Sequence, residues 1–178
     1  MTYQSLFPTR YGWAAVAADD DGITCVVLPT EKTRAKSRLS KATVDNGSSP
    51  MLGRLQADMI RFFEGGKADF TNYPISLKAG TAFQRRVWAQ AVKIPCGKTA
   101  TYGEIAEAMG NPSCARAVGQ ALNANPVPLL IPCHRVVSSS SLGGFSAGAD
   151  LKEKMLDLEY GKGSHGVPEV RQQGHIRR

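Results

Sequence analysis

Two helical segments separated by a short turn restrict the possible folds of this chain more than any other feature of its sequence. In "TYGEIAEAMGNPSCARAVGQALN", Thr101 and Glu104 have the spacing of a capping box at the start of a helix. The tripeptide Gly-Asn-Pro then makes a turn, after which Ser113 can cap a second helix that directs Val118 and Leu122 to a core. This arrangement predicts a helix-turn-helix, and a purely structural pair of helices is the alternative.

The face of the second helix that points away from the core is small or polar. It carries Arg116, Gly119, Gln120 and Asn123, which share one helical face. A glycine there lets the backbone come close to a nucleic-acid groove, with one arginine projecting. The formal net charge of +7 and the isoelectric point near 9.4 favour an anionic partner such as nucleic acid, although many basic proteins bind none.

Residues 1–80 predict an α/β domain with a short antiparallel sheet. Two apolar runs flank the Asp-Asp-Asp-Gly turn at 19–22, which is the pattern of a β-hairpin. The segment "MLGRLQADMIRFFEGG" has apolar residues at helical spacing, and "DFTNYPISLK" predicts one more strand, at a sheet edge because Pro74 cannot donate to a ladder. We interpret the basic stretch 31–41 as a solvated loop, with a phosphate contact as the alternative.

The sequence changes character near Gly80, and we place the boundary between two domains there. Residues 81–162 predict a mainly helical domain, in which "TAFQRRVWAQAVKI" and "ADLKEKMLDLEYG" have helical periodicity. Residues 163–178, rich in Gly, Gln and Arg, predict a mobile basic tail. The chain has no apolar run of about 18 residues and its N-terminus lacks a signal-peptide pattern, so we expect a soluble, cytoplasmic protein without a membrane partner.

A cysteine and a histidine stand side by side in "IPCHRVV". Free cysteines are more often buried and inert than reactive, and a thiol with a pKa near 8.5 is only a few per cent thiolate at neutral pH. His134 and Arg135 supply a base and a positive charge next to Cys133. In an extended segment adjacent side chains point to opposite faces, so we expect His134 to reach Cys133 through a bend or a bridging water.

The last helix offers a carboxylate that could orient this histidine. Leu151, Met155 and Leu158 define its buried stripe, and Glu159 lies at the edge of that stripe. A half-exposed acid at the helix end is the alternative for Glu159. The four cysteines are scattered without a CxxC pair, which favours neither a metal site nor a disulfide framework.

Five segments in unbroken order, over about residues 80–160, resemble the O6-alkylguanine-DNA alkyltransferase family: "TAFQRRVW", "IPCGKTATYGEIA", "NPSCARAVGQALNANPVPLLIPCHRVV", "LGGFSAG" and "MLDLE". The resemblance implies a ribonuclease H-like α/β N-terminal domain and a C-terminal domain that holds a winged helix-turn-helix. It further implies DNA repair, in which Cys133 irreversibly takes the alkyl group of an O6-alkylguanine without any metal or other cofactor. Each molecule then reacts once, because a thioether is a very poor leaving group. O4-alkylthymine as a second lesion is left open.

The same resemblance implies roles for individual residues. His134 acts as the base through a water, Glu159 orients His134, and Asn125 organises the turn of the active site. Tyr102 hydrogen-bonds the base and assists proton delivery to the departing guanine. The guanine pocket is lined by Leu122, Phe145, the carbonyls of Cys133 and Val136, and the amide of Ser146.

On the DNA side, the resemblance implies a monomer that binds double-stranded DNA in the minor groove and flips the damaged nucleotide out of the stack. Arg116 fits the residue that fills the vacated space, and Ala117 and Gly119 allow close backbone approach. Gln120 and Asn123 lie on the same helical face. Cooperative binding of several copies is left open.

Three positions depart from the family pattern: the loop between Cys133 and "GGF" is one residue shorter, Phe145 stands where tyrosine is common, and Gln120 replaces a usually small residue. Three alternatives remain. They are an alkyltransferase-like protein that only binds damaged DNA, against which Cys133 argues, a helix-turn-helix transcriptional regulator and a cysteine hydrolase.

Overall fold

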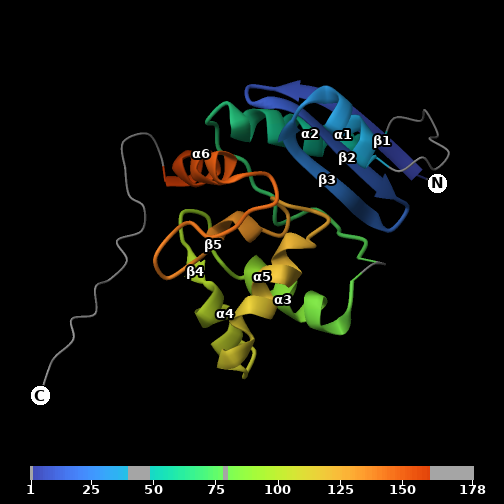
Figure 1. Ribbon diagram of the computed structural model, residues 1–178. Coiled ribbons are helices and arrows are strands. Elements are labelled where there is room, and N and C mark those ends of the chain that lie inside the picture. The colour runs from blue at the N-terminus through green and yellow to red at the C-terminus, as the bar shows by residue number, and fades with distance from the viewer. Residues whose placement is uncertain (1, 40–48, 78–79, 161–178) are drawn as a thin grey trace, which may run out of the picture.

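A three-stranded antiparallel sheet forms the N-terminal part of the protein. The computed structural model describes residues 2–39, 49–77 and 80–160 (Figure 1). The strands β1 (Thr2–Thr9), β2 (Gly12–Asp19) and β3 (Gly22–Thr30) follow one another in the order β1-β2-β3. The predicted hairpin is confirmed. Its turn is fixed by Asp19, whose Oδ1 accepts from the amides of Asp21 and Gly22 at 2.9 and 3.1 Å.

Helices cover both faces of the sheet. Residues 14–18 of β2 are buried without interruption, and since alternate side chains of a strand point to opposite faces, both faces must be packed. The helix α2 (Pro50–Phe63) contacts β1 and β2 through an apolar stripe that contains Leu55, Met59 and Phe63, as the sequence predicts. The helix α1 (Lys32–Arg38) contacts β2 and β3.

The structure corrects the interpretation of the basic stretch 31–41. The described part forms α1 rather than a loop, although Ala35 is its one buried residue. A helix of 7 residues with one buried position has almost no apolar periodicity, so the sequence pattern does not predict this helix. Residues 40 and 41 lie outside the described residues.

The strand predicted over "DFTNYPISLK" is also wrong. Within the described part of this segment the backbone makes a single parallel bridge, between Ile75 and Ile23 of β3. Its two hydrogen bonds run from the Ile23 amide to the Pro74 carbonyl and from the Ser76 amide to the Ile23 carbonyl, at 2.8 and 2.9 Å. Pro74 has no amide to extend the ladder, so pairing ends after one residue.

The second half of the chain is mainly helical, with a short parallel pair of strands. Its elements are α3 (Ala82–Val92), β4 (Ala100–Thr101), α4 (Tyr102–Ala108), the 3-10 helix η1 (Pro112–Cys114), α5 (Ala115–Asn123), the 3-10 helix η2 (Cys133–Arg135), β5 (Val136–Val137) and α6 (Ala149–Tyr160). Figure 1 shows most of this half below the sheet, whereas its last helix, α6, lies beside the sheet and α2. The strands β4 and β5 join residues that are far apart in sequence.

The helices α4 and α5 pack against each other, and α3 contacts both of them. Thr101 and Glu104 form the predicted capping box at the start of α4. Ser113 does not cap α5: its hydroxyl donates to Asn111 at 2.6 Å, and η1 lies between the two helices. The Trp88 indole donates to the Ala121 carbonyl at 2.8 Å, which fixes the register of α5 on α3.

One hydrophobic cluster runs through both halves of the chain, from Phe7 in β1 to Met155 in α6. Next to it, the Val26 amide of β3 donates to the Pro126 carbonyl after α5, at 2.9 Å. The sheet therefore supports the segment that leads to Cys133. The domain boundary near residue 80 stays a prediction, and the tail predicted for 163–178 lies outside the described residues. No helix among the described residues is long and apolar enough to cross a membrane.

Candidate active site

Cys133 begins a 3-10 turn, so the segment bends instead of remaining extended. The residue is 6% exposed, and Asn125 holds it in place. The Asn125 side-chain amide donates to the Ile131 carbonyl at 2.9 Å and to the Cys133 sulfur at 3.1 Å. Its carbonyl oxygen accepts from the Val127 amide at 3.0 Å. One asparagine thus closes the turn and places a donor on the sulfur.

His134 lies in the protein interior, where its exposure is 0%. Its Nε2 is 2.8 Å from Oε1 of Glu159. An ionised carboxylate only accepts hydrogen bonds, so Nε2 carries the proton and Nδ1 keeps a lone pair. Among the described residues nothing forms a hydrogen bond with Nδ1. Burial lowers the pKa of His134, although Glu159 opposes this shift, so the imidazole is neutral at pH 7 and able to accept a proton at Nδ1.

Glu159 is a buried, fully paired carboxylate, which excludes the half-exposed alternative. Arg135 donates to it from Nε at 2.9 Å and from Nη2 at 2.8 Å, and the Gly97 amide donates at 3.2 Å. Burial raises the pKa of Glu159, but the hydrogen bonds from His134 and Arg135 outweigh burial and bring it to about 2. The carboxylate therefore remains charged and keeps the imidazole in one tautomer.

Lys152 is a buried cation that sequence reasoning missed. It is 0% exposed, and its ammonium group donates to the carbonyls of Val136, at 2.6 Å, and Leu142. It thereby ties β5 to the far end of the loop that follows Cys133. Burial lowers the pKa of Lys152 to about 8, and the interaction with Cys133 opposes this shift.

The surroundings of Cys133 shift the pKa of its thiol in both directions. Burial raises the pKa of the Cys133 thiol, whereas the hydrogen bond from Asn125, the charge of Lys152 and nearby backbone amides all lower it. The thiol consequently needs a base to react at neutral pH, and the donors around it stabilise the thiolate once formed.

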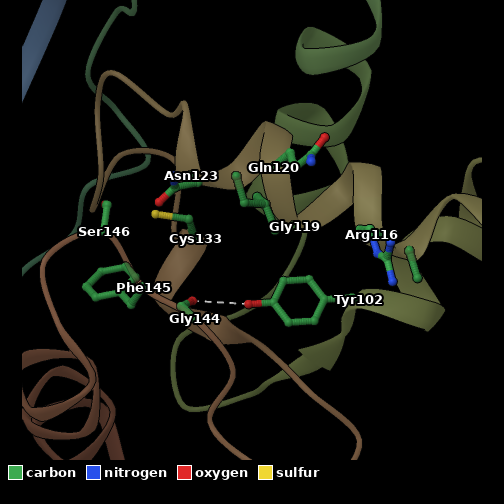
Figure 2. Close-up of a pocket in the computed structure, with 11 residues that line it drawn as sticks. Tyr102, Arg116, Gly119, Gln120, Asn123, Cys133, Gly144, Phe145 and Ser146 are labelled. Atoms are coloured by element: carbon green, nitrogen blue, oxygen red, sulfur yellow. Dashed lines mark hydrogen bonds between the residues drawn. The ribbon is translucent and has the colours of Figure 1, made fainter.

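A pocket of about 420 Å³ opens over Cys133. Figure 2 shows Arg116 and Ser146 at opposite ends of this pocket, with Cys133 and Tyr102 between them. The α5 residues Gly119 and Asn123 form one side. Its volume lies within the range of cavities that hold small ligands, about 300–1,000 Å³.

Tyr102 lies between α5 and the loop after Cys133, since a Cβ on Gly119 would be 3.6 Å from its ring. Its hydroxyl donates to the Gly144 carbonyl at 3.1 Å (Figure 2). Gly143 has φ +71°, and a Cβ there would lie 2.8 Å from the tyrosine ring and hydroxyl, so only glycine fits. Burial, followed by the nearby Cys133, raises the pKa of Tyr102, which keeps the phenol protonated at neutral pH.

The structure brings most of the sequence-predicted residues to this pocket or directly behind it. The wall contains Tyr102, Arg116, Gly119, Gln120, Leu122, Asn123, Cys133, Phe145 and Ser146. His134, Glu159 and Asn125 lie behind the sulfur. Sequence reasoning missed Ala115 and Gly144, which also line the pocket.

Val136, which was expected in the pocket, is not among the residues that line it. Val136 is 0% exposed and its carbonyl accepts from Lys152, and the contact of this carbonyl with the guanine stays a prediction. Ala117 is half-buried on α5 outside the lining. Within the described part of the chain, no three His, Cys, Asp or Glu side chains are grouped so that they could hold a metal ion.

Comparison with known proteins places this geometry in a family. The family described as "6-O-methylguanine DNA methyltransferase, DNA binding domain" matches residues 82–161. A probable methylated-DNA–protein-cysteine methyltransferase of Acanthamoeba polyphaga mimivirus is 48% identical over 138 residues, which are 78% of this chain and 90% of the relative. The methylated-DNA–protein-cysteine methyltransferase of Methanosarcina acetivorans is 35% identical over 159 residues, which are 88% of this chain and 97% of that protein.

Solved structures agree. The crystal structure of Mycobacterium tuberculosis OGT in complex with DNA superposes with a TM-score of 0.74 at 31% identity, over 89% of this chain and 92% of that chain. The small antiparallel sheet and its helices are thus shared with structures of this class. Since relatives of this similarity align along most of its length, the chain belongs to the methylated-DNA–protein-cysteine methyltransferase family, DNA-repair proteins that transfer an alkyl group to a cysteine.

Proposed function

We propose that Cys133 is the cysteine that receives the alkyl group from O6-alkylguanine in DNA. The observation that carries this proposal is the position of its sulfur in the wall of the pocket, with a neutral, unpartnered imidazole nitrogen in the adjacent residue. The other three cysteines, Cys25, Cys96 and Cys114, are not in that wall. Cys133 is therefore the nucleophile best placed to meet a bound base.

The transfer begins when the Cys133 thiol passes its proton to Nδ1 of His134 through a bridging water. The sulfur then attacks the alkyl carbon, an S–C bond forms, and the bond between this carbon and O6 of guanine breaks. The electron pair leaves with the guanine, which takes up one proton, so the thiol hydrogen is replaced by the alkyl group. Glu159 holds the imidazole tautomer, and the Asn125 amide stabilises the developing thiolate.

Tyr102 assists the departing guanine. Its phenol is protonated at neutral pH and at present donates to Gly144, so a bound base can take over this hydrogen bond. Leu122, Phe145 and the Ser146 amide flank the base. The absence of a hydroxyl on Phe145, the shorter loop before it and the larger Gln120 tune the alkyl groups and DNA sites that the pocket accepts.

A stacked base cannot bring its O6 substituent to Cys133, so the damaged nucleotide flips out of the duplex, which costs a few kcal/mol. Arg116 is exposed at the end of the pocket away from Ser146, where its side chain can occupy the vacated stack. Ala117 and Gly119 let α5 approach the minor groove, with Gln120 and Asn123 on the contact face.

The proposed contact of α5 with DNA also assigns a role to each part of the fold. The helices α4 and α5 act as a winged helix-turn-helix on DNA, within a mainly α domain over 81–162, and residues 1–80 form a ribonuclease H-like α/β domain. The protein acts as a monomer in the cytoplasm. O4-alkylthymine is a second substrate to test beside O6-alkylguanine.

Intact-mass analysis tests the assignment of Cys133. After incubation with a duplex that contains O6-methylguanine, each molecule should gain one methyl group, located on the Cys133 peptide, with no further turnover. Cys133→Ala should bind the duplex and gain no mass, whereas the control Cys114→Ala should react like the wild type. Methylation of Cys133→Ala would place the nucleophile elsewhere, and repeated turnover would favour a hydrolase.

A further inference from the structure

A second cleft lies beside the pocket and shares residues with it. This cleft, here called the basic cleft, has a volume of about 480 Å³ and is lined by β3, by Arg34 and Arg38 of α1, and by the segment after α5. Asn123 and Ser146 belong to both the basic cleft and the pocket. The two cavities are therefore adjacent, and a polymer with one unit in the pocket has room to place a neighbouring unit in the basic cleft.

The basic cleft carries unbalanced positive charge. Arg34 and Arg38 are four residues apart, so their side chains leave the same face of α1. Both are exposed, and in the parts of the chain that the structure describes neither forms an ion pair. The described residues that line the cleft include no acid. Burial raises the pKa of Cys25 in the same cleft, and the Arg38 guanidinium partly opposes this shift.

A hydrogen bond joins β3 to the segment after α5 in the wall of the cleft. The Val26 amide of β3 donates to the Pro126 carbonyl at 2.9 Å, and both residues line the cleft. Asn125, which positions Cys133, also lines this cleft. A ligand held by α1 would thus lie close to the turn that carries the nucleophile.

We propose that the basic cleft binds a backbone phosphate of the same duplex whose damaged nucleotide occupies the pocket. The identification of the partner as DNA rests on the proposed function. Guanidinium groups match phosphate oxygens in charge and planar geometry, and two of them one helical turn apart can grip one group or two successive ones. Such contacts carry no base sequence information, so the cleft fixes the position of the strand and leaves recognition of the lesion to the pocket.

The effect on binding has a characteristic salt dependence. Each neutralised phosphate steepens the fall of log affinity with log salt by about 0.9. Replacing both arginines with alanine should therefore lower the magnitude of this slope by about 1 to 2 and weaken duplex binding about tenfold or more at low salt. The loss should shrink as the salt concentration rises.

The first experiment measures duplex affinity by fluorescence anisotropy over a series of KCl concentrations. Arg34→Ala/Arg38→Ala should show the smaller slope. Lys36→Ala is the matched control, because Lys36 is an exposed cation of the same helix that does not line the cleft. Equal slope changes in both variants would overturn the proposal in favour of general electrostatic attraction. If the double alanine variant unfolds, Arg34→Gln/Arg38→Gln takes its place.

The second experiment removes phosphate charges one at a time, with a methylphosphonate scanned along each strand of the lesion duplex. One or two positions near the lesion should weaken binding by the wild type, and these positions should lose their effect in the double variant. If each methylphosphonate weakened binding by the double variant as much as binding by the wild type, the proposal would be overturned. Failure of the proposed function is distinguishable, because the wild type would then not react even with free O6-benzylguanine, which has no phosphate.

Discussion

His134 and Glu159 are joined by a hydrogen bond of 2.8 Å, and their side chains are 0% and 2% exposed. The bond fixes the proton on Nε2 and directs the basic nitrogen Nδ1 away from the carboxylate. Arg135, the next residue in the chain, completes the charge balance of Glu159. The motif Cys-His-Arg thus places the proposed nucleophile, its proposed base and the counter-ion of the proposed orienting acid in three consecutive positions.

Glu159→Gln should remove a pH-dependent contribution to stability. The folded pKa of Glu159 is lowered from 4.5 to about 2, so its stabilising effect is present above about pH 4.5 and is lost as the pH falls towards 2. This shift corresponds to about 3 kcal/mol. Urea unfolding at several pH values gives the free energy of unfolding as a function of pH. Between pH 4.5 and 2 this free energy should change less with pH in Glu159→Gln than in the wild type. The control Asp157→Asn, an exposed acid of α6, should keep the wild-type slope.

Lys152→Met should raise the pKa of the Cys133 thiol, because it removes a positive charge that stabilises the thiolate. The rate of reaction with O6-benzylguanine should fall at pH 7 and recover at higher pH. Lys154→Met, which removes an exposed cation of the same helix, is the control. An unchanged pH profile in Lys152→Met would limit the lysine to holding the loop through Val136 and Leu142.

Asn125→Asp should slow transfer more than Asn125→Ala. Both variants lose the donor to Ile131 and Cys133, and the alanine also leaves the buried Val127 amide unpaired, which costs about 1–3 kcal/mol of stability. The aspartate adds a negative charge about 3 Å from the sulfur, which further raises the thiol pKa. Rates against pH for the two variants would separate these effects, and a faster Asn125→Asp would contradict this electrostatic account.

Arg116→Ala should slow repair in duplex DNA far more than reaction with free O6-benzylguanine. In the proposed mechanism only the duplex requires flipping, and removal of the side chain proposed to fill the stack raises the free energy of the flipped state. Single-turnover rates on both substrates provide the measurement. Equal losses on the two would exclude the stacking role of Arg116.

Local chemistry explains which elements could be predicted. The hairpin turn at Asp19, the capping box of α4 and the apolar stripe of α2 depend on residues within a few positions of one another. The strand β1 was not anticipated, because its burial pattern is uneven and it contains Pro8. The helix α1 has one buried residue and so leaves no periodic pattern to detect.

Long-range partners explain what the sequence could not predict about the site. A lysine in an amphipathic helix is normally expected in solvent. The burial of Lys152 is set by the carbonyls of Val136 and Leu142, 16 and 10 residues away. From the sequence alone, Glu159 is equally consistent with an exposed acid at a helix end, because its contact with Arg135 depends on the fold. Adjacent Cys133 and His134 were recognisable as a pair, whereas their geometry depends on a turn that Asn125 closes.

The burial of Cys133 determines the fate of the protein after repair. Its sulfur is reached through the pocket that held the base, and a reagent able to strip off the alkyl group would have to enter that space and displace a thioether sulfur. Regeneration is therefore closed off by the poor leaving ability of a thioether sulfur. A cell can then erase only as many lesions as it holds unspent copies, and every further lesion requires a newly synthesised molecule.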